Sequence, residues 1–329
     1  MRGSRIAVGA FIALGLAAAT PAAGTAAPEP PSVVLVTHDC AMREFICPPF
    51  AQAARRTGTR ARIVSLDPRQ DVAGTFALLA QQGHDLVIGD PEMSPELAAV
   101  AERYPQARFA TIDIPLRDAV PRPPNVAIVE IRPRQAAYLA GWLAGRMEGL
   151  RPGPDVVGAV GGFPVPPVDD FIVAFRAGAL RAAPGVRVLT DYARSFTDPT
   201  ACAVAAERQI AEGAGVLLDV AGGCGPGTLD AARSAGVWAV GVDRERAGLG
   251  PHILTSVLKR YDRAFAMLMR QARANRLPAG RGIAMGLRRG GTELGRISPR
   301  VPTRVRRELA AVRRDLVAGR IRVPGADDG

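Results

Sequence analysis

The sequence predicts an α/β protein made of two doubly wound lobes, each a parallel sheet covered by helices on both faces. Short aliphatic runs alternate with helix-forming stretches along most of the 329-residue chain. These runs show almost no apolar–polar alternation, which is typical of strands that are buried on both faces. The pattern restarts after the Arg-Pro-Gly-Pro segment 151–154, which indicates two successive units.

The first unit contains five aliphatic runs with helical stretches between them. We expect its helices at 45–57, 71–82 and 95–103, and Pro105 ends the last of them because proline cannot continue a helix. A proline-rich loop covers 115–124. The strands are predicted at 33–37, 62–66, 86–89, 108–113 and 126–131.

The second unit repeats this alternation. Its helices are predicted at 135–147, 170–182, 199–212 and 228–234, and its strands at 156–160, 186–190, 216–220 and 237–242. In doubly wound sheets, ligands bind in the crevice at the carboxyl ends of the strands. The candidate ligand contacts therefore follow strands, at 38–39, 90, 113, 161–162, 191–196, 222–227 and 243.

The N-terminus has the pattern of a secretory signal peptide over residues 1–27. Arg2 and Arg5 precede an uncharged apolar run at 6–19, and small residues lead to Ala27. An uncleaved anchor is the alternative, but a bilayer span needs about 20 apolar residues. We expect cleavage and a periplasmic or extracellular protein. No cysteine that would mark a lipid attachment site follows the apolar run.

The chain is basic, with 42 Lys and Arg against 31 Asp and Glu. The basic residues are dispersed, and the densest stretch, 300–314, contains no aromatic residue that could stack on a base, so we expect no nucleic-acid partner. Lys259 is the only lysine. Either a binding site needs the compact point charge of this lysine, or the lysine remains by chance on a solvated helix while arginine is used everywhere else. Composition does not decide between these two interpretations.

Four cysteines, Cys40, Cys47, Cys202 and Cys224, allow two disulfides in an oxidising compartment. Pairing of sequence neighbours, 40 with 47 and 202 with 224, is the simplest of three possibilities. A zinc site is disfavoured because the spacing is not C-x-x-C and no histidine lies near the cysteines.

The sequence offers little for catalysis. It has no G-x-S-x-G motif and only three histidines, of which His38 alone follows a predicted strand. The glycine-rich segment 222–227 lacks the G-x-G-x-x-G spacing, which favours a turn that lets the backbone approach a ligand. We expect no enzymatic activity, no cofactor and no metal.

Several short segments resemble, in order along the chain, motifs of the basic membrane protein family. This family comprises substrate-binding proteins of ABC importers, including purine-nucleoside-binding lipoproteins. The segment Leu-Thr-Ser-Val-Leu-Lys-Arg at 254–260 is the most specific of them. The others are Gly161-Gly162 with Pro166, Phe171 and Phe175, and the segments 195–199, 220–225, 241–243 and 286–291.

The resemblance implies a type I periplasmic-binding-protein fold whose two lobes are joined by a hinge and close on a small-molecule ligand. It implies an N-terminal lobe at 28–131 with a returning segment near 257–280, and a C-terminal lobe at 132–256 with 281–329 added. It also implies a monomer that serves an ABC permease. A sensing or scavenging protein of the same fold is the alternative.

The resemblance also implies the site residues. Asp243 and Lys259 would hold ribose hydroxyls, Phe196 and Phe45 would sandwich a base, and Asp113 would add a polar contact. The first loop departs from the family pattern: His38 stands where members have an aspartate, unless Asp39 takes its role, and Ile46 replaces an asparagine. We therefore expect a nucleoside or a related ribose-containing ligand, with the identity of the base left open.

Overall fold

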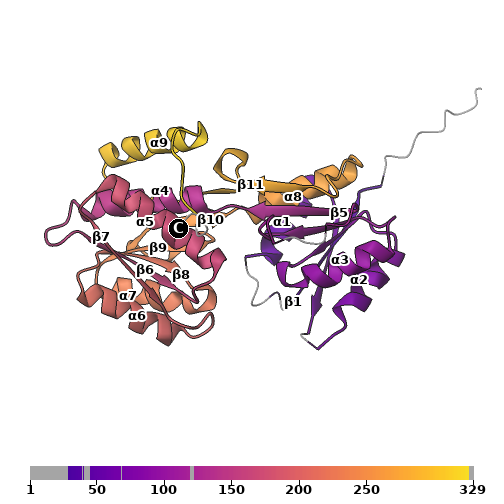
Figure 1. The fold of residues 1–329 in the computed structure, drawn as a ribbon, viewed down its shortest axis with the longest axis horizontal. Coiled ribbons are helices and arrows are strands. Elements are labelled where there is room, and N and C mark those ends of the chain that lie inside the picture. Colours follow the sequence, from indigo (N-terminus) through magenta and orange to yellow (C-terminus); the bar gives the residue numbers. More distant parts are fainter. Residues whose placement is uncertain (1–28, 39, 41–44, 68, 119–121, 326–329) are drawn as a thin grey trace, which may run out of the picture.

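The computed structural model describes residues 29–38, 40, 45–67, 69–118 and 122–325, and in them the chain forms two α/β lobes side by side (Figure 1). Each lobe contains one six-stranded sheet. The doubly wound, two-lobed architecture predicted from the sequence is confirmed. The predicted signal peptide 1–27 and Asp39 lie outside the described residues.

The first lobe has the strand order β11-β5-β4-β3-β1-β2, and all its strand pairs are parallel. Helices α1 and α8 cover one face of this sheet and α2 and α3 the other. The strands are β1 (Ser32–His38), β2 (Arg60–Leu66), β3 (Leu86–Gly89), β4 (Phe109–Ile112), β5 (Val126–Ile131) and β11 (Gly282–Met285). The helices are α1 (Cys47–Thr57), α2 (Val72–Gln81), α3 (Ser94–Arg103) and α8 (Tyr261–Arg273), with a 3-10 turn η1 (Pro91–Met93).

The second lobe has the order β12-β10-β9-β8-β6-β7, in which only β12 runs antiparallel to its neighbour. Its strands are β6 (Val156–Gly161), β7 (Arg187–Tyr192), β8 (Val216–Val220), β9 (Trp238–Asp243), β10 (Ile253–Lys259) and β12 (Thr292–Leu294). Helices α4 (Arg134–Glu148), α5 (Pro166–Ala182) and α9 (Thr303–Val317) cover one face, and α6 (Pro199–Ala211) and α7 (Pro226–Ser234) the other. Its 3-10 turns are η2 (Gly222–Cys224), η3 (Ala247–Leu249) and η4 (Leu287–Arg289).

Three chain segments cross between the lobes. They lie between β5 and α4, between β10 and α8, and between β11 and β12. The sequence-based division gave 281–329 to the second lobe, whereas β11 pairs with β5 in the first. This strand is only four residues long and starts with glycine, so its sequence carries too little pattern to reveal its partner.

Helices α4 and α5 approach each other more closely than ordinary side chains allow. A Cβ added at Gly141 would lie 1.9 Å from the carbonyl oxygen of Phe175, and one at Gly178 would lie 2.0 Å from the carbonyl oxygen of Tyr138. Glycine is therefore required at both positions so that the two backbones can touch.

Both cysteine pairs are bonded as sequence neighbours. Cys40–Cys47 ties the loop after β1 to the start of α1, and Cys202–Cys224 ties α6 to η2. The apolar run at 6–19 lies outside the described residues, and no helix among those described is long and apolar enough to cross a membrane.

Candidate functional site

Two aspartates mark the carboxyl edges of the two sheets. Asp113 directly follows β4 in the first lobe, and Asp243 is the last residue of β9 in the second. Both adopt the left-handed backbone conformation, with φ of 63° and 65°. Non-glycine residues in this conformation are uncommon, and they concentrate at functional sites where the fold holds them in place.

Lys259 connects the two edges. It is the last residue of β10, beside β9, and its Nζ lies 2.8 Å from Oδ2 of Asp113 in the other lobe. Its side chain is only 13% exposed and lies over the ring of Phe171 at 5.6 Å. The only lysine is therefore held between the lobes, and the solvated-helix alternative is wrong because the residue ends a strand.

Tyr261 is a candidate site residue that the sequence analysis did not identify. It is the first residue of α8, and its hydroxyl donates to Oδ2 of Asp113 at 2.5 Å. The position was accessible from the sequence, because Tyr261 directly follows the most family-like segment, 254–260, two residues after Lys259. What the pattern did not reveal is that the chain changes lobes between these two residues.

The electrostatics follow from this burial. Burial raises the pKa of the Asp243 carboxyl, although Lys259 and Arg246 oppose the rise. For Lys259, burial alone would lower the pKa, but Asp113 and Asp243 outweigh it and raise the pKa above its ordinary value. The ammonium is therefore firmly charged, and it lies between two carboxyl groups from different lobes.

Two aromatic side chains of the second lobe, Phe163 and Phe196, pack against each other after β6 and β7. Phe196, in the turn after β7, is 40% exposed, and its ring centroid lies 5.2 Å from that of Phe163. A Cβ at Gly162 would meet the Phe196 ring at 2.3 Å, so the glycine lets the ring lie directly on the backbone after β6. The backbone of η2 supports the same turn, since the Cys224 N–H donates to the Phe196 carbonyl at 3.0 Å.

In the first lobe, fewer of the residues predicted to bind the ligand lie near Asp113. Phe45 packs against Tyr261 with ring centroids 5.7 Å apart, which places it beside the Asp113 cluster. His38 ends β1, two strands away from β4, and its Nδ1 lies 3.4 Å from the Leu66 carbonyl at the end of β2. The ring is therefore directed toward β2 and away from Asp113, and Asp39 lies outside the described residues.

No group of three or more His, Cys, Asp or Glu with metal-binding geometry occurs in the described part of the chain. Two carboxylates and an ammonium lie near one another where the chain crosses between the lobes, with aromatic rings on each lobe. A carboxylate accepts hydrogen bonds from hydroxyl groups and an ammonium donates them.

Comparison with known proteins gives a family match. The model of the family described as "ABC transporter substrate-binding protein PnrA-like" matches residues 53–327. Basic membrane protein B of Borreliella afzelii is 29% identical over 58% of this chain and 57% of its own length. The ABC transporter nucleoside-binding protein BmpA of Lactococcus lactis is 23% identical over 82% of this chain and 79% of its own.

A solved structure has the same fold. The ABC transporter solute-binding protein of Conexibacter woesei superposes with a TM-score of 0.74 at 26% identity, covering 90% of this chain and 99% of that one. The likeness therefore extends over both lobes and not over one of them alone.

Proposed function

The chain belongs to the family of PnrA-like ABC transporter substrate-binding proteins, and we propose that it captures a nucleoside or a related ribose-containing solute between its two lobes. It would deliver that solute, chemically unchanged, to an ABC permease in the membrane. We further propose that the mature chain acts as a monomer outside the cytoplasm, in the periplasm or the extracellular space.

The observation that carries the proposal is the juxtaposition of Asp243 and Lys259 at the carboxyl ends of adjacent strands, β9 and β10. The two oxygens of one carboxylate can accept from both hydroxyls of a cis-diol, and the neighbouring ammonium can donate to the same hydroxyls. Lys259 is held by Asp113 at 2.8 Å, so its position is fixed before a ligand arrives. We assign this pair to the ribose.

The aromatic residues support a planar group at the other end of the ligand. Phe196 presents a partly exposed ring on the second lobe, and Phe45 lies beside Tyr261 on the first. Base–aromatic stacking contributes about 1–3 kcal/mol per base in proteins that bind single-stranded nucleic acids. The relative from Lactococcus lactis is an ABC transporter nucleoside-binding protein, which is consistent with such a ligand.

The test is a binding screen with residues 28–329. Isothermal titration with purine and pyrimidine nucleosides, free bases, ribose and amino acids should give saturable one-to-one binding for at least one nucleoside. A ligand at 100 times its dissociation constant stabilises a protein by about 2.7 kcal/mol, so thermal shift suits the first pass. Chromatography after incubation should return the nucleoside intact.

Two variants make the screen specific for this site. K259Q removes the ammonium and should abolish or strongly weaken nucleoside binding, whereas R307Q removes an exposed cation on α9 and should leave it unchanged. If K259Q and its parent bind the nucleoside with equal affinity, the assignment of Lys259 to the ligand site is wrong. A screen in which only amino acids or sugars without a base bind would overturn the nucleoside proposal, and release of free base would overturn the non-enzymatic one.

A further inference from the structure

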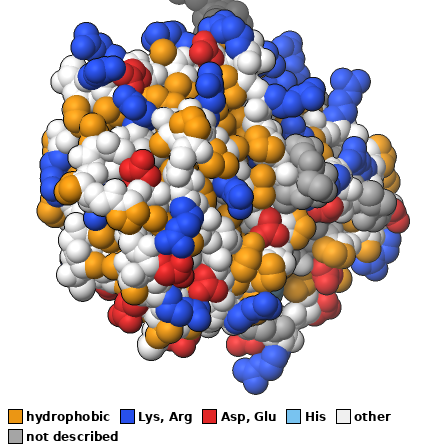
Figure 2. Space-filling model, turned by 60° about the vertical axis from the view of Figure 1, so that its left-hand side comes forward, with side chains coloured by type: hydrophobic (Ala, Val, Ile, Leu, Met, Phe, Trp, Pro, Cys, Tyr) orange, Lys and Arg blue, Asp and Glu red, His pale blue; other side chains and the backbone are white. Residues whose placement is uncertain are grey.

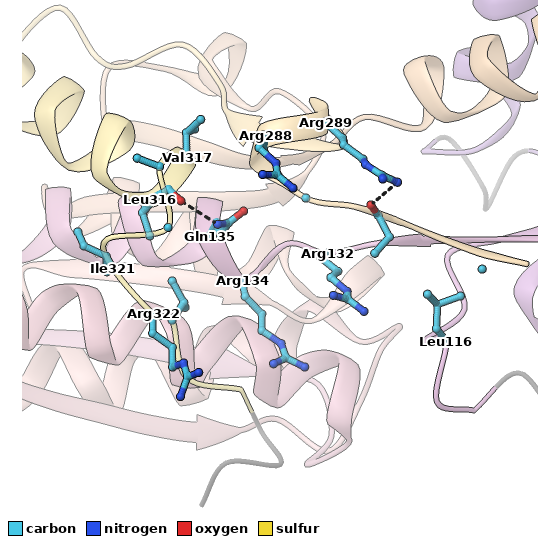
Figure 3. Close-up of a pocket in the computed structure, with 16 residues that line it drawn as sticks. Leu116, Arg132, Arg134, Gln135, Arg288, Arg289, Leu316, Val317, Ile321 and Arg322 are labelled. Atoms are coloured by element: carbon cyan, nitrogen blue, oxygen red, sulfur yellow. Dashed lines mark hydrogen bonds between the residues drawn. The ribbon is translucent and has the colours of Figure 1, made fainter.

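A cavity lies beside two of the segments that join the lobes, and its lining includes none of the residues proposed to bind the nucleoside. Its volume is about 850 Å³, which is within the usual range for small-molecule pockets. Its walls come from both lobes and from two of the three crossing segments (Figure 3). They include β11, the start of α4, the η4 turn, and the chain that follows α9.

Five arginines line this cavity. Arg132 and Arg134 flank the crossing into α4, Arg288 and Arg289 lie on η4, and Arg322 follows α9. Figure 3 shows that Arg132, Arg134 and Arg322 extend toward the same side of the pocket, with Arg288 approaching from the opposite wall. Segments that are far apart in the sequence therefore bring guanidinium groups to one concavity.

Few carboxylates offset this charge. Glu130 pairs with Arg132 at 2.8 Å and Asp170 pairs with Arg134 at 3.1 Å, which leaves an excess of three positive charges. Arg289 donates to a backbone carbonyl, that of Ala284, at 3.4 Å. Within the described residues, Arg288 and Arg322 have no ion-pair partner.

The surroundings of the cavity distinguish it from the rest of the basic surface. Figure 2 shows Lys and Arg side chains interspersed with acidic ones over most of the visible face. The cavity is lined by arginines together with apolar side chains, among them Leu316 and Ile321 at one end and Leu116 at the other (Figure 3). A concave site lined by one sign of charge focuses the field and raises the local concentration of the opposite ion.

We propose that this hinge cavity binds a small multivalent anion that carries phosphate or carboxylate groups. Guanidinium groups match both kinds of group through paired N–H donors, and several forks around one concavity favour an anion with more than one charge. Gln135 stabilises the walls, because its side chain donates to the Leu316 carbonyl at 3.4 Å and accepts from the Leu287 N–H at 3.1 Å. The proposal does not rest on the nucleoside function, since within the described residues no residue that lines the cavity forms a hydrogen bond or ion pair with Asp243 or Lys259.

The test uses residues 28–329 titrated with pyrophosphate and with citrate at low ionic strength. One anion should bind per chain, and R288A/R322A should weaken binding at least about tenfold, since hydrogen bonds to charged groups are among the strongest in proteins. The matched control R307A/R313A removes two exposed arginines from α9 and should change the affinity less than about twofold. Circular dichroism of each variant checks that it is folded.

Three outcomes would overturn the proposal. The first is absence of saturable binding for both anions, and the second is equal weakening by the two double variants, which would mean diffuse attraction to a basic surface. The third concerns Asp327 and Asp328, which lie beyond the described residues. Anions that bind only after D327N/D328N would identify the pocket's occupant as the chain's own end and not an ion from solution.

Discussion

The two lobes have the same strand order but use equivalent positions differently. Read from one edge, the sheets run β2-β1-β3-β4-β5-β11 and β7-β6-β8-β9-β10-β12, so β4 corresponds to β9. Each of these strands leads into an aspartate, Asp113 or Asp243, and both aspartates adopt the left-handed conformation. The fold thus places the same residue type, with the same backbone geometry, on each side of the cleft.

The environments of the two carboxylates differ. Asp113 accepts from Lys259 at 2.8 Å and from Tyr261 at 2.5 Å. The Asp243 side chain makes no hydrogen bond within the described part of the chain, and burial raises its pKa. A half-buried carboxylate without a hydrogen bond from the protein keeps only part of its hydration, and a ligand with two hydroxyl donors would satisfy it. The comparison therefore separates a positioning carboxylate, Asp113, from a ligand acceptor, Asp243.

The sharpest way to break this comparison is to neutralise each carboxylate in turn. D243N should weaken nucleoside binding about 100-fold, because one acceptor oxygen is replaced by an NH2 donor and the hydrogen bond to the other loses its charge assistance. D113N should cost only about tenfold, because it acts indirectly, by loosening Lys259. Asparagine tolerates the left-handed conformation, so neither change disturbs the backbone. Titration calorimetry measures both, and a larger loss for D113N would reverse the assigned roles.

The close packing of two helices in the second lobe can be tested by mutation. In the second lobe α4 and α5 touch through Gly141 and Gly178, so Gly141→Ala should lower the free energy of unfolding by about 2 kcal/mol through overpacking. On an exposed helix the same change would stabilise by up to about 1 kcal/mol. The control is Gly185→Ala, at an exposed turn where an added Cβ meets nothing within 4 Å. Urea denaturation measures both, and an unchanged midpoint for Gly141→Ala would contradict the backbone contact.

The regular parts of this fold could be predicted from the sequence. Strands β3, β5 and β8 have the predicted bounds, because each is a short uncharged or nearly uncharged run between turn residues. Helix α5 begins at Pro166, four residues before the predicted start, since proline is favoured in the first turn. The family assignment drawn from short motifs is also confirmed.

The hinge could not be predicted in the same way. Strand β11 is four residues long, and the chain changes lobes across Arg260, the single residue between Lys259 and Tyr261, so no periodicity reports the crossing. The contact of Tyr261 with Asp113 spans 148 positions in the sequence. It requires the chain to leave the first lobe between β5 and α4 and to return to it between β10 and α8. The assignment of His38, Asp39, Phe45, Phe196, Asp113, Asp243 and Lys259 to ligand binding stays a prediction.

The central strands β3 and β8 differ in charge. Strand β3 is uncharged, whereas β8 contains Asp219, which is fully buried. Burial raises the pKa of Asp219 to about 7, with Arg246 opposing and Asp243 adding to the rise. Between pH 4 and 7 the folded state thus keeps a proton that the unfolded state has lost, so this group's contribution to stability falls as pH rises.

D219N tests this difference, since an amide does not titrate. Its stability relative to the parent should increase by about 2 kcal/mol from pH 5 to pH 8. Chemical denaturation at both pH values measures the change, and taking the difference between variant and parent removes the pH dependence of all other groups. A constant difference would show that Asp219 titrates normally despite its burial.

The smallest expected effect concerns Phe196 and distinguishes binding of the base from binding of the sugar. Phe196 has a partly exposed ring on the second lobe and no polar atom on its side chain, so its contribution should depend on the base alone. F196A should weaken nucleoside binding about tenfold, within the range measured for base–aromatic stacking, and leave the much weaker binding of ribose unchanged. V204A, which shortens an exposed apolar side chain on α6, is the control. Equal losses for nucleoside and ribose would place Phe196 at the sugar end and remove the argument for a stacked base.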